Sequence, residues 1–225
     1  MNKIKYIAAV LIAIAGVGIQ QAKADTVTYT ISVGNSAISP YPGPYASVLV
    51  NRTSTTTATI TFTSLTNSGN IYLFGDGSSV AVNVNATSWT IGSFSSSNAG
   101  TGFTQPPPLS DGGSGNVDGF GVLNQTVNSF DGFTHSSDTI SFTLTNTSGG
   151  PGWLTAGSVL VANSNGAIVA AHIFVTSSPA NAANGAVSTG FAANGGSFVP
   201  DGGTTVMLLG AALGALGIAR RFLMS

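Results

Sequence analysis

The chain has 225 residues and almost no charge: six Lys and Arg, seven Asp and Glu, and a formal net charge of −1 at pH 7. Arg52 is the only cation between Asp25 and Pro200 and cysteine is absent, which excludes a nucleic-acid or anionic-membrane binding surface, thiol catalysis and thiolate metal sites. The stretch between the two termini is long enough for one domain with its own core.

The first 24 residues have the features of a secretory signal peptide. Lys3 and Lys5 precede an apolar run over 7–19, and Ala22-Lys23-Ala24 forms an A-x-A cleavage site. The run has the length of a signal-peptide core and is short for a retained membrane anchor, which is the alternative interpretation. We therefore expect a signal peptidase to recognise Ala22 and Ala24 and to leave Asp25 as the mature N-terminus.

Residues 25–176 are predicted to form an all-β ectodomain. Apolar residues alternate with Thr, Ser or Asn, a period of two that is typical of half-buried strands. The alternating stretches are 27–33, 57–63, 80–85 and 140–145. Asn165-Gly166, between 158–162 and 167–175, predicts a type I′ hairpin. Helix-forming stretches are scarce, so we expect an antiparallel β-sandwich, with a jelly-roll-like arrangement as one version.

Two stretches are predicted to be loops. Residues 92–115 are rich in Ser and Gly and contain three consecutive prolines, and residues 177–198 are rich in Ala, Asn and Gly. The second composition is typical of a flexible spacer that would tether the ectodomain to the C-terminal segment.

The C-terminal segment, residues 199–225, has three parts. Val199-Pro200-Asp201-Gly202-Gly203 comes first, an apolar run over 206–219 follows, and Arg220-Arg221 ends the run. Fourteen apolar residues span about 21 Å as a helix against a hydrocarbon core of about 30 Å. Extension to Thr204, with the arginines reaching the cytoplasmic side, predicts a single transmembrane helix over 204–219. The alternative, a buried core helix, would place two arginines directly beside a uniformly apolar helix.

This arrangement resembles the PEP-CTERM class of bacterial sorting signals, and specifically its VPDSG-CTERM variant. Val199, Pro200, Asp201 and Gly203 match that pattern, and Gly202 stands where the pattern has serine. The resemblance implies an inner-membrane precursor that an exosortase, a membrane-embedded cysteine transpeptidase, cuts at the motif. It also implies a final location at the cell surface or in an exopolysaccharide-rich matrix. Residues 72–77 and 116–121 more loosely resemble ectodomains found with such tails, which mostly lack an assigned activity.

Carboxylates in Gly-rich stretches are the candidate metal ligands. Asp111, Asp118, Asp131 and Asp138 could hold calcium together with loop carbonyls. Asp-Gly pairs are also ordinary turn residues, and the spacing matches no EF-hand loop. We assign no metal site and expect no cofactor, with calcium as the alternative.

No catalytic constellation is marked out by the sequence. His135 and His172 are the only histidines, and either could join Asp138 and a serine in a Ser-His-Asp arrangement. The chain lacks the Gly-x-Ser-x-Gly elbow that would support a serine nucleophile, and no pair of carboxylates is singled out for glycoside hydrolysis. We therefore expect a non-enzymatic protein, with a secreted hydrolase as the least favoured alternative.

The remaining candidates concern glycans. Asn-x-Ser/Thr sequons at Asn51, Asn85, Asn124 and Asn146 are candidate glycosylation sites, and Asn85 is expected to point outward from its strand. Trp89, Trp153, Tyr41 and Tyr45 could form a sugar-stacking platform or could be core and rim residues. The sequence thus predicts a surface or matrix protein associated with exopolysaccharide and biofilm, with a lectin-like or adhesin module as the alternative.

Overall fold

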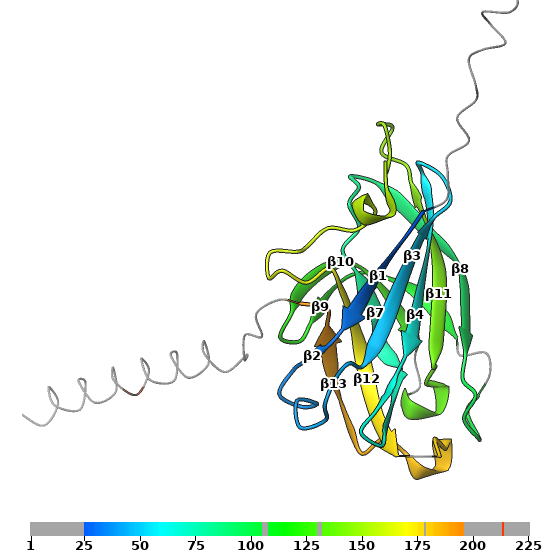
Figure 1. The fold of residues 1–225 in the computed structure, drawn as a ribbon, viewed down its shortest axis with the longest axis vertical. Helices are drawn as coiled ribbons and strands as arrows, with labels where there is room; N and C mark the ends of the chain where they lie inside the picture. Colours follow the sequence, from blue (N-terminus) through cyan, green and yellow to red (C-terminus); the bar gives the residue numbers. More distant parts are fainter. Residues whose placement is uncertain (1–24, 105–107, 130–131, 178, 196–212, 214–225) are drawn as a thin grey trace, which may run out of the picture.

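The computed structural model of the protein describes residues 25–104, 108–129, 132–177, 179–195 and 213. Within these ranges the chain forms thirteen β-strands and three short 3-10 helices, η1 to η3 (Figure 1). None of the described residues belongs to a helix that is both long and apolar enough to cross a membrane. The predicted signal peptide, 1–24, lies outside the described residues, as does the predicted helix over 204–219 apart from Leu213.

One sheet has five strands in the order β1-β3-β4-β11-β8, all antiparallel. These strands are β1 (Asp25–Ile31), β3 (Ala46–Arg52), β4 (Thr57–Ser64), β11 (Thr139–Asn146) and β8 (Trp89–Ser97). Strands β4 and β11 alternate strictly between buried apolar residues and half-buried Thr or Ser. The period of two therefore gives this sheet one apolar inner face and one hydroxyl-rich outer face.

The second sheet runs β2-β13-β12-β7-β10-β9, and β6 pairs with β12 beside β7. Its strands are β2 (Val33–Gly34), β5 (Thr66–Asn67), β6 (Asn70–Phe74), β7 (Asp76–Val82), β9 (Leu109–Val117), β10 (Gly121–Ser129), β12 (Val169–Ser177) and β13 (Ser188–Ala193). The 3-10 helices are η1 (Gly132–His135), η2 (Ala156–Ser158) and η3 (Ala182–Asn184). From β7 onward the chain passes repeatedly between the two sheets.

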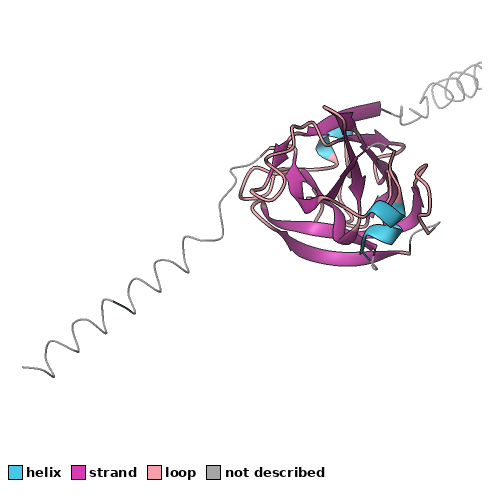
Figure 2. Ribbon diagram, turned by 90° about the horizontal axis from the view of Figure 1, so that it is seen from below, coloured by secondary structure: helices cyan, strands magenta, loops and turns pink. Residues whose placement is uncertain are grey.

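The main hydrophobic core lies between the sheets and draws side chains from both. Residues that share this core include Val48, Val50, Ile60, Phe62, Ile140, Phe142 and Leu144 from the first sheet and Val80, Val82, Val127, Val169, Ala171, Ile173 and Val175 from the second. Seen from below, the strands lie around a common centre (Figure 2). The all-β, antiparallel prediction is confirmed, and the arrangement is consistent with the predicted β-sandwich.

The predicted loop over 92–115 is wrong for most of its length, because β8 and β9 lie there. A Cβ on Gly112 or Gly115 of β9 would collide with the side chain of Thr126 on β10. The glycines that suggested a loop are therefore needed for close approach between two paired strands.

The predicted spacer over 177–198 is also wrong for residues 188–193. Strand β13 pairs with β12 from Ala170↔Ala193 to Val175↔Ser188, and β2 covers its other edge at Ala192↔Gly34. Ala192 and Ala193 are fully buried. Small residues in this stretch allow dense packing rather than chain flexibility.

The predicted hairpin at Asn165-Gly166 is a turn of a different kind. The N–H of Gly166 donates to the carbonyl of Asn163 at 3.0 Å, and the N–H of Asn163 donates to the carbonyl of Ala167 at 2.8 Å. Residues 158–162 form no strand there: they begin in η2 and contribute only an isolated bridge between Leu160 and Val84. The turn therefore leads into β12 without a paired strand before it.

Candidate functional site

The first described residue, Asp25, is held through both oxygens of its carboxylate. Oδ1 accepts a hydrogen bond from Nε of Arg52 at 2.7 Å, and Oδ2 accepts one from the N–H of Ala156 at 2.8 Å. The Ala156 N–H, together with the Arg52 guanidinium, lowers the pKa of the Asp25 carboxyl below its usual value. Since the Arg52 side chain is only 8% exposed, its charge needs this partner. The predicted peptidase residues Ala22 and Ala24 lie outside the described residues.

At the other end, Asn194 fixes the chain five residues before Val199. Its Oδ1 accepts hydrogen bonds from the N–H groups of Ile168 at 2.9 Å and Val169 at 3.0 Å, and its own N–H donates to the Val169 carbonyl at 3.1 Å. We call this arrangement the Asn194 clamp. The motif Val199, Pro200, Asp201, Gly202 and Gly203 and the basic pair Arg220 and Arg221 lie outside the described residues.

Each described aspartate among the calcium candidates is bound by its own local partners. The Asp111 carboxylate accepts from Nε2 of Gln125 at 2.7 Å and from the N–H of Gly113 at 2.8 Å. Asp118 accepts from Nδ2 of Asn35 at 3.0 Å. Among the described residues no three His, Cys, Asp or Glu gather as a metal-binding group, and the fourth candidate, Asp131, lies outside them. The structure therefore does not bring these aspartates together into one site.

Asp138 is likewise engaged away from the histidines considered with it. Its Oδ1 accepts from the Ser97 hydroxyl at 3.0 Å and its Oδ2 from the N–H of Ala99 at 2.7 Å. It lines a cavity of about 450 Å³ together with Asn98 and Pro179. His172 binds Gly77 and Thr189 instead of Asp138. The ring of the other histidine, His135, lies 3.4 Å from the Thr134 hydroxyl.

His172 belongs to a row of aromatic rings on the face of the second sheet away from the main core. Its ring stacks on Phe191 at 4.4 Å and on Phe174 at 5.3 Å between centroids. Phe133 continues the row from Phe174 at 5.6 Å, and Phe103 follows at 5.3 Å. We call these five residues the aromatic row. Phe174, in the middle of the row, is buried, and the other four rings are partly exposed on either side of it.

Burial keeps the His172 ring neutral. Desolvation is the main cause and lowers its pKa below the usual value, opposed by the Gly77 carbonyl and the charge of Asp76. Because a carbonyl can only accept, the neutral ring carries its proton on Nδ1 toward Gly77 at 3.3 Å. Nε2 then accepts from the Thr189 hydroxyl at 2.7 Å.

Of the two alternatives for Trp89, Trp153, Tyr41 and Tyr45, the burial of these residues agrees with core and rim positions and not with a sugar-stacking platform. Trp153 and Tyr45 are each only 2% exposed, so neither ring offers a free face. The Tyr45 hydroxyl donates to the Tyr41 carbonyl, whereas Trp89 donates to Gln125 on β10. The sequence did not single out the aromatic row because its members come from separate segments and join only through strand pairing.

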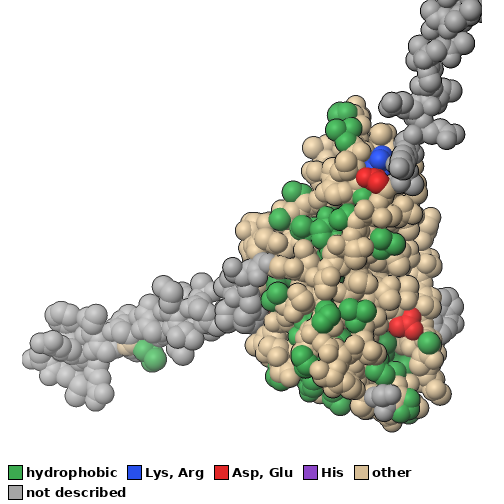
Figure 3. All heavy atoms as spheres, viewed as in Figure 1, with side chains coloured by type: hydrophobic (Ala, Val, Ile, Leu, Met, Phe, Trp, Pro, Cys, Tyr) green, Lys and Arg blue, Asp and Glu red, His purple; other side chains and the backbone are tan. Residues whose placement is uncertain are grey.

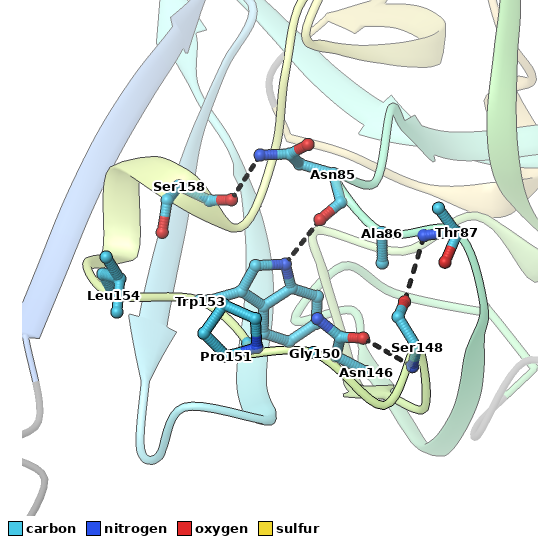
Figure 4. Close-up of a pocket in the computed structure, with 11 residues that line it drawn as sticks. Asn85, Ala86, Thr87, Asn146, Ser148, Gly150, Pro151, Trp153, Leu154 and Ser158 are labelled. Carbon is cyan, nitrogen blue, oxygen red and sulfur yellow. Dashed lines mark hydrogen bonds between the residues drawn. The ribbon is translucent and has the colours of Figure 1, made fainter.

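Trp153 instead forms the floor of a pocket of about 370 Å³ (Figure 4). Its Nε1 donates to the Asn85 carbonyl at 2.8 Å, and the Asn85 side chain donates to the Ser158 carbonyl at 3.0 Å. On the opposite wall, Asn146 accepts from the N–H of Ser148 at 2.9 Å. The residues that line this pocket carry amides, hydroxyls and apolar groups and no ionisable side chain, so acid–base chemistry has no group to use there.

The four sequons differ in how free their side chains are. Asn85 is exposed, as predicted, whereas Asn51, Asn124 and Asn146 are half-buried. Asn124 accepts from the N–H of Val84 at 2.7 Å and donates to its carbonyl at 2.9 Å. Glycan attachment at Asn124 would break this pair of hydrogen bonds, so Asn85 is sterically the more accessible sequon.

Comparison with known proteins bears on the C-terminal segment. Residues 199–222 match the family model described as the VPDSG-CTERM motif. No curated protein and no solved structure is similar to the chain at a significant level. The match covers the predicted motif, the apolar run and both arginines. The chain therefore carries a C-terminal sorting signal of the PEP-CTERM/exosortase type, the signal of an exported, surface-directed protein.

Proposed function

We propose that the protein is an exported precursor whose ectodomain is delivered to the cell surface when an exosortase-type enzyme cuts at Val199–Gly203. The match of residues 199–222 to the sorting signal carries this proposal. Pro200 fixes its own φ and favours an extended Val199, the geometry that a peptidase cleft binds. A signal peptidase first cuts after Ala24. The 204–219 helix then holds the precursor in the inner membrane with Arg220 and Arg221 on the cytoplasmic side.

The fold supports a cut at this position. The described strands begin at Asp25 and end at Ala193, so the two cuts leave every described strand in one product. The product of both cuts is the whole described domain.

The proposal is tested by determining the N-terminal and C-terminal residues of the mature protein. Mass spectrometry of surface-extracted protein should find Asp25 at the N-terminus and a C-terminus within 199–203. Deletion of residues 206–225 should move the protein from the cell surface to the medium in fractionation. Recovery of a stable surface form that retains Met224 and Ser225 contradicts the proposal.

At the surface we propose a non-enzymatic role in a polysaccharide-rich matrix. The viewed face of the domain is largely neutral, with few charged side chains (Figure 3). Hydroxyls cover the outer face of the first sheet, where Thr61 and Ser141 lie 3.1 Å apart across β4 and β11. A surface with few charges and many hydroxyls and amides suits a hydrated glycan environment.

The aromatic row favours carbohydrate binding as a second candidate function. Partly exposed rings lie beside the exposed Thr189 hydroxyl, whose oxygen can still accept a hydrogen bond from a sugar while its proton goes to His172. A glycan array probed with segment 25–198 tests this, with Phe191→Ala expected to remove binding and Leu154→Ala, at a 70% exposed site, expected to keep it. Unchanged binding by Phe191→Ala contradicts the assignment. Binding lost on chelation would point to calcium at the aspartates instead.

A further inference from the structure

The chain that leads to the sorting signal is fixed within the fold up to Asn194. Six residues of β13 pair with β12, and Ala192 and Ala193 are fully buried. The Asn194 clamp then holds the next residue on two backbone N–H groups and one carbonyl. The domain therefore ends immediately before the motif, where a spacer was predicted.

Covalent geometry limits how far the motif can lie from this point. Only residues 196–198 separate Gly195 from Val199, and four Cα–Cα steps reach at most about 14 Å. Nine steps lead from Gly195 to Thr204, the start of the predicted membrane helix, and reach at most about 32 Å. An enzyme that holds Val199 in its cleft must therefore hold it within about 14 Å of Gly195.

The surface around Gly195 is built by the turn before β12 and the start of β10. An ideal Cβ on Gly195 would lie 3.6 Å from the carbonyl oxygen of Gly166. Nδ2 of Asn163 joins this turn to β10 by donating to the carbonyls of Phe120 at 2.9 Å and Val122 at 3.0 Å. The Val122 side chain is 55% exposed. We call residues 163–166 and Val122 the exit surface.

We infer that the exit surface docks against the membrane-embedded enzyme that cuts the sorting signal, with residues 196–198 setting the distance between the domain and the cleft. This inference rests on the proposed function. An exposed apolar residue among amide groups suits contact with a protein partner. The short tether keeps the enzyme close to this surface, so the folded domain itself becomes part of what the enzyme recognises.

The experiment follows processing of the full-length precursor in cells that contain the exosortase, by pulse-chase and immunoblotting. Val122→Asp should slow processing about tenfold, because it places a charge in the centre of the contact. Val187→Asp is the matched control, since Val187 is 61% exposed and precedes the opposite end of β13; it should leave the rate unchanged. Deletion of 196–198 should also slow processing at least about tenfold, because the motif can no longer span the distance to the cleft.

A long tether separates docking from damage to folding or export. With twelve Gly and Ser residues inserted after Ser197, the motif can reach the cleft without contact, and Val122→Asp should no longer slow processing. Equal rates for wild type and Val122→Asp on the native tether overturn the inference, as does a defect in Val122→Asp that persists on the long tether. Either result overturns only the docking inference, and the proposed function still holds as long as the wild-type precursor is processed. If wild type is not processed and Pro200→Ala with Asp201→Ala changes nothing, the proposed function itself fails.

Discussion

The Asn194 clamp gives the sharpest prediction for the folded domain. Asn194→Ala removes the acceptor of two backbone N–H groups, those of Ile168 and Val169. Val169 is fully buried, so its N–H is left without any partner. Ile168 is half-buried, so its N–H can recruit water. An orphaned buried donor costs about 1–3 kcal/mol. We expect the free energy of unfolding to fall by about 2 kcal/mol, which for a domain of this size lowers Tm by about 4–8 °C.

The assay is thermal and denaturant unfolding of segment 25–198, with amide hydrogen exchange to locate the effect. The amides of Ile168 and Val169 should lose protection first, because their acceptor is gone. Asn194→Asp is the matched control: a carboxylate keeps both acceptor positions and should remain within about 1 kcal/mol of wild type. Wild-type stability of Asn194→Ala, together with unchanged exchange at both amides, would refute the view that this residue fixes the end of β13.

Three further predictions concern the ion pair, the buried histidine and the core. The Asp25 carboxyl has a lowered pKa and stabilises the fold only while it is ionised, so the wild type should lose stability as the pH falls below about 4. Asp25→Asn should lose less stability over this pH range. Melting curves from pH 3 to 7 that superimpose on those of the wild type contradict this prediction. Burial lowers the pKa of His172, so the unfolded chain takes up a proton first and stability should fall as the pH drops below about 6.5. His172→Gln should remove that part of the fall, and an unaltered profile would show that the ring does not contribute. Phe62 is fully buried between Phe74 and Phe142, so Phe62→Ala should cost about 3–5 kcal/mol and Phe62→Leu much less in guanidinium unfolding; equal losses would argue against a cavity effect.

Strands with a strict apolar alternation were predictable from the sequence. The stretches that became β1, β4 and β11 each carry three or more apolar residues at every second position, and burial follows that period in the structure. Strands β8, β9 and β13 lack such a pattern because Gly, Ser and Ala fill the positions that would reveal it. Their structure is decided by backbone pairing and by the close approach of neighbouring strands, which local composition does not record. The order of the strands in each sheet could not be predicted from the sequence for the same reason. The jelly-roll-like arrangement of the β-sandwich stays a prediction.

The candidate sites divide in a similar way. The sorting signal could be predicted because it is a contiguous motif followed by an apolar run and two arginines, and the family model confirms it. The aromatic row could not, since its rings come together only once β12, β13, η1 and the loop before β9 are placed. The Asn194 clamp was hidden for another reason: one Asn in a stretch rich in Ala, Asn and Gly looks like any other residue of a spacer.

The two ends of the domain place different demands on the two predicted cuts. Asp25 is already paired with Arg52 in the sheet, and its carboxylate is bound on both oxygens. A peptidase that takes the Ala24–Asp25 bond into its cleft needs the Asp25 carboxylate released from Arg52 and from the N–H of Ala156, because these contacts hold the first residue of the product against the domain. We therefore expect the N-terminal cut to precede the docking of Asp25. The C-terminal cut can follow folding, since Val199 lies five residues beyond Asn194. A folded precursor that is still cut after Ala24 would contradict this order.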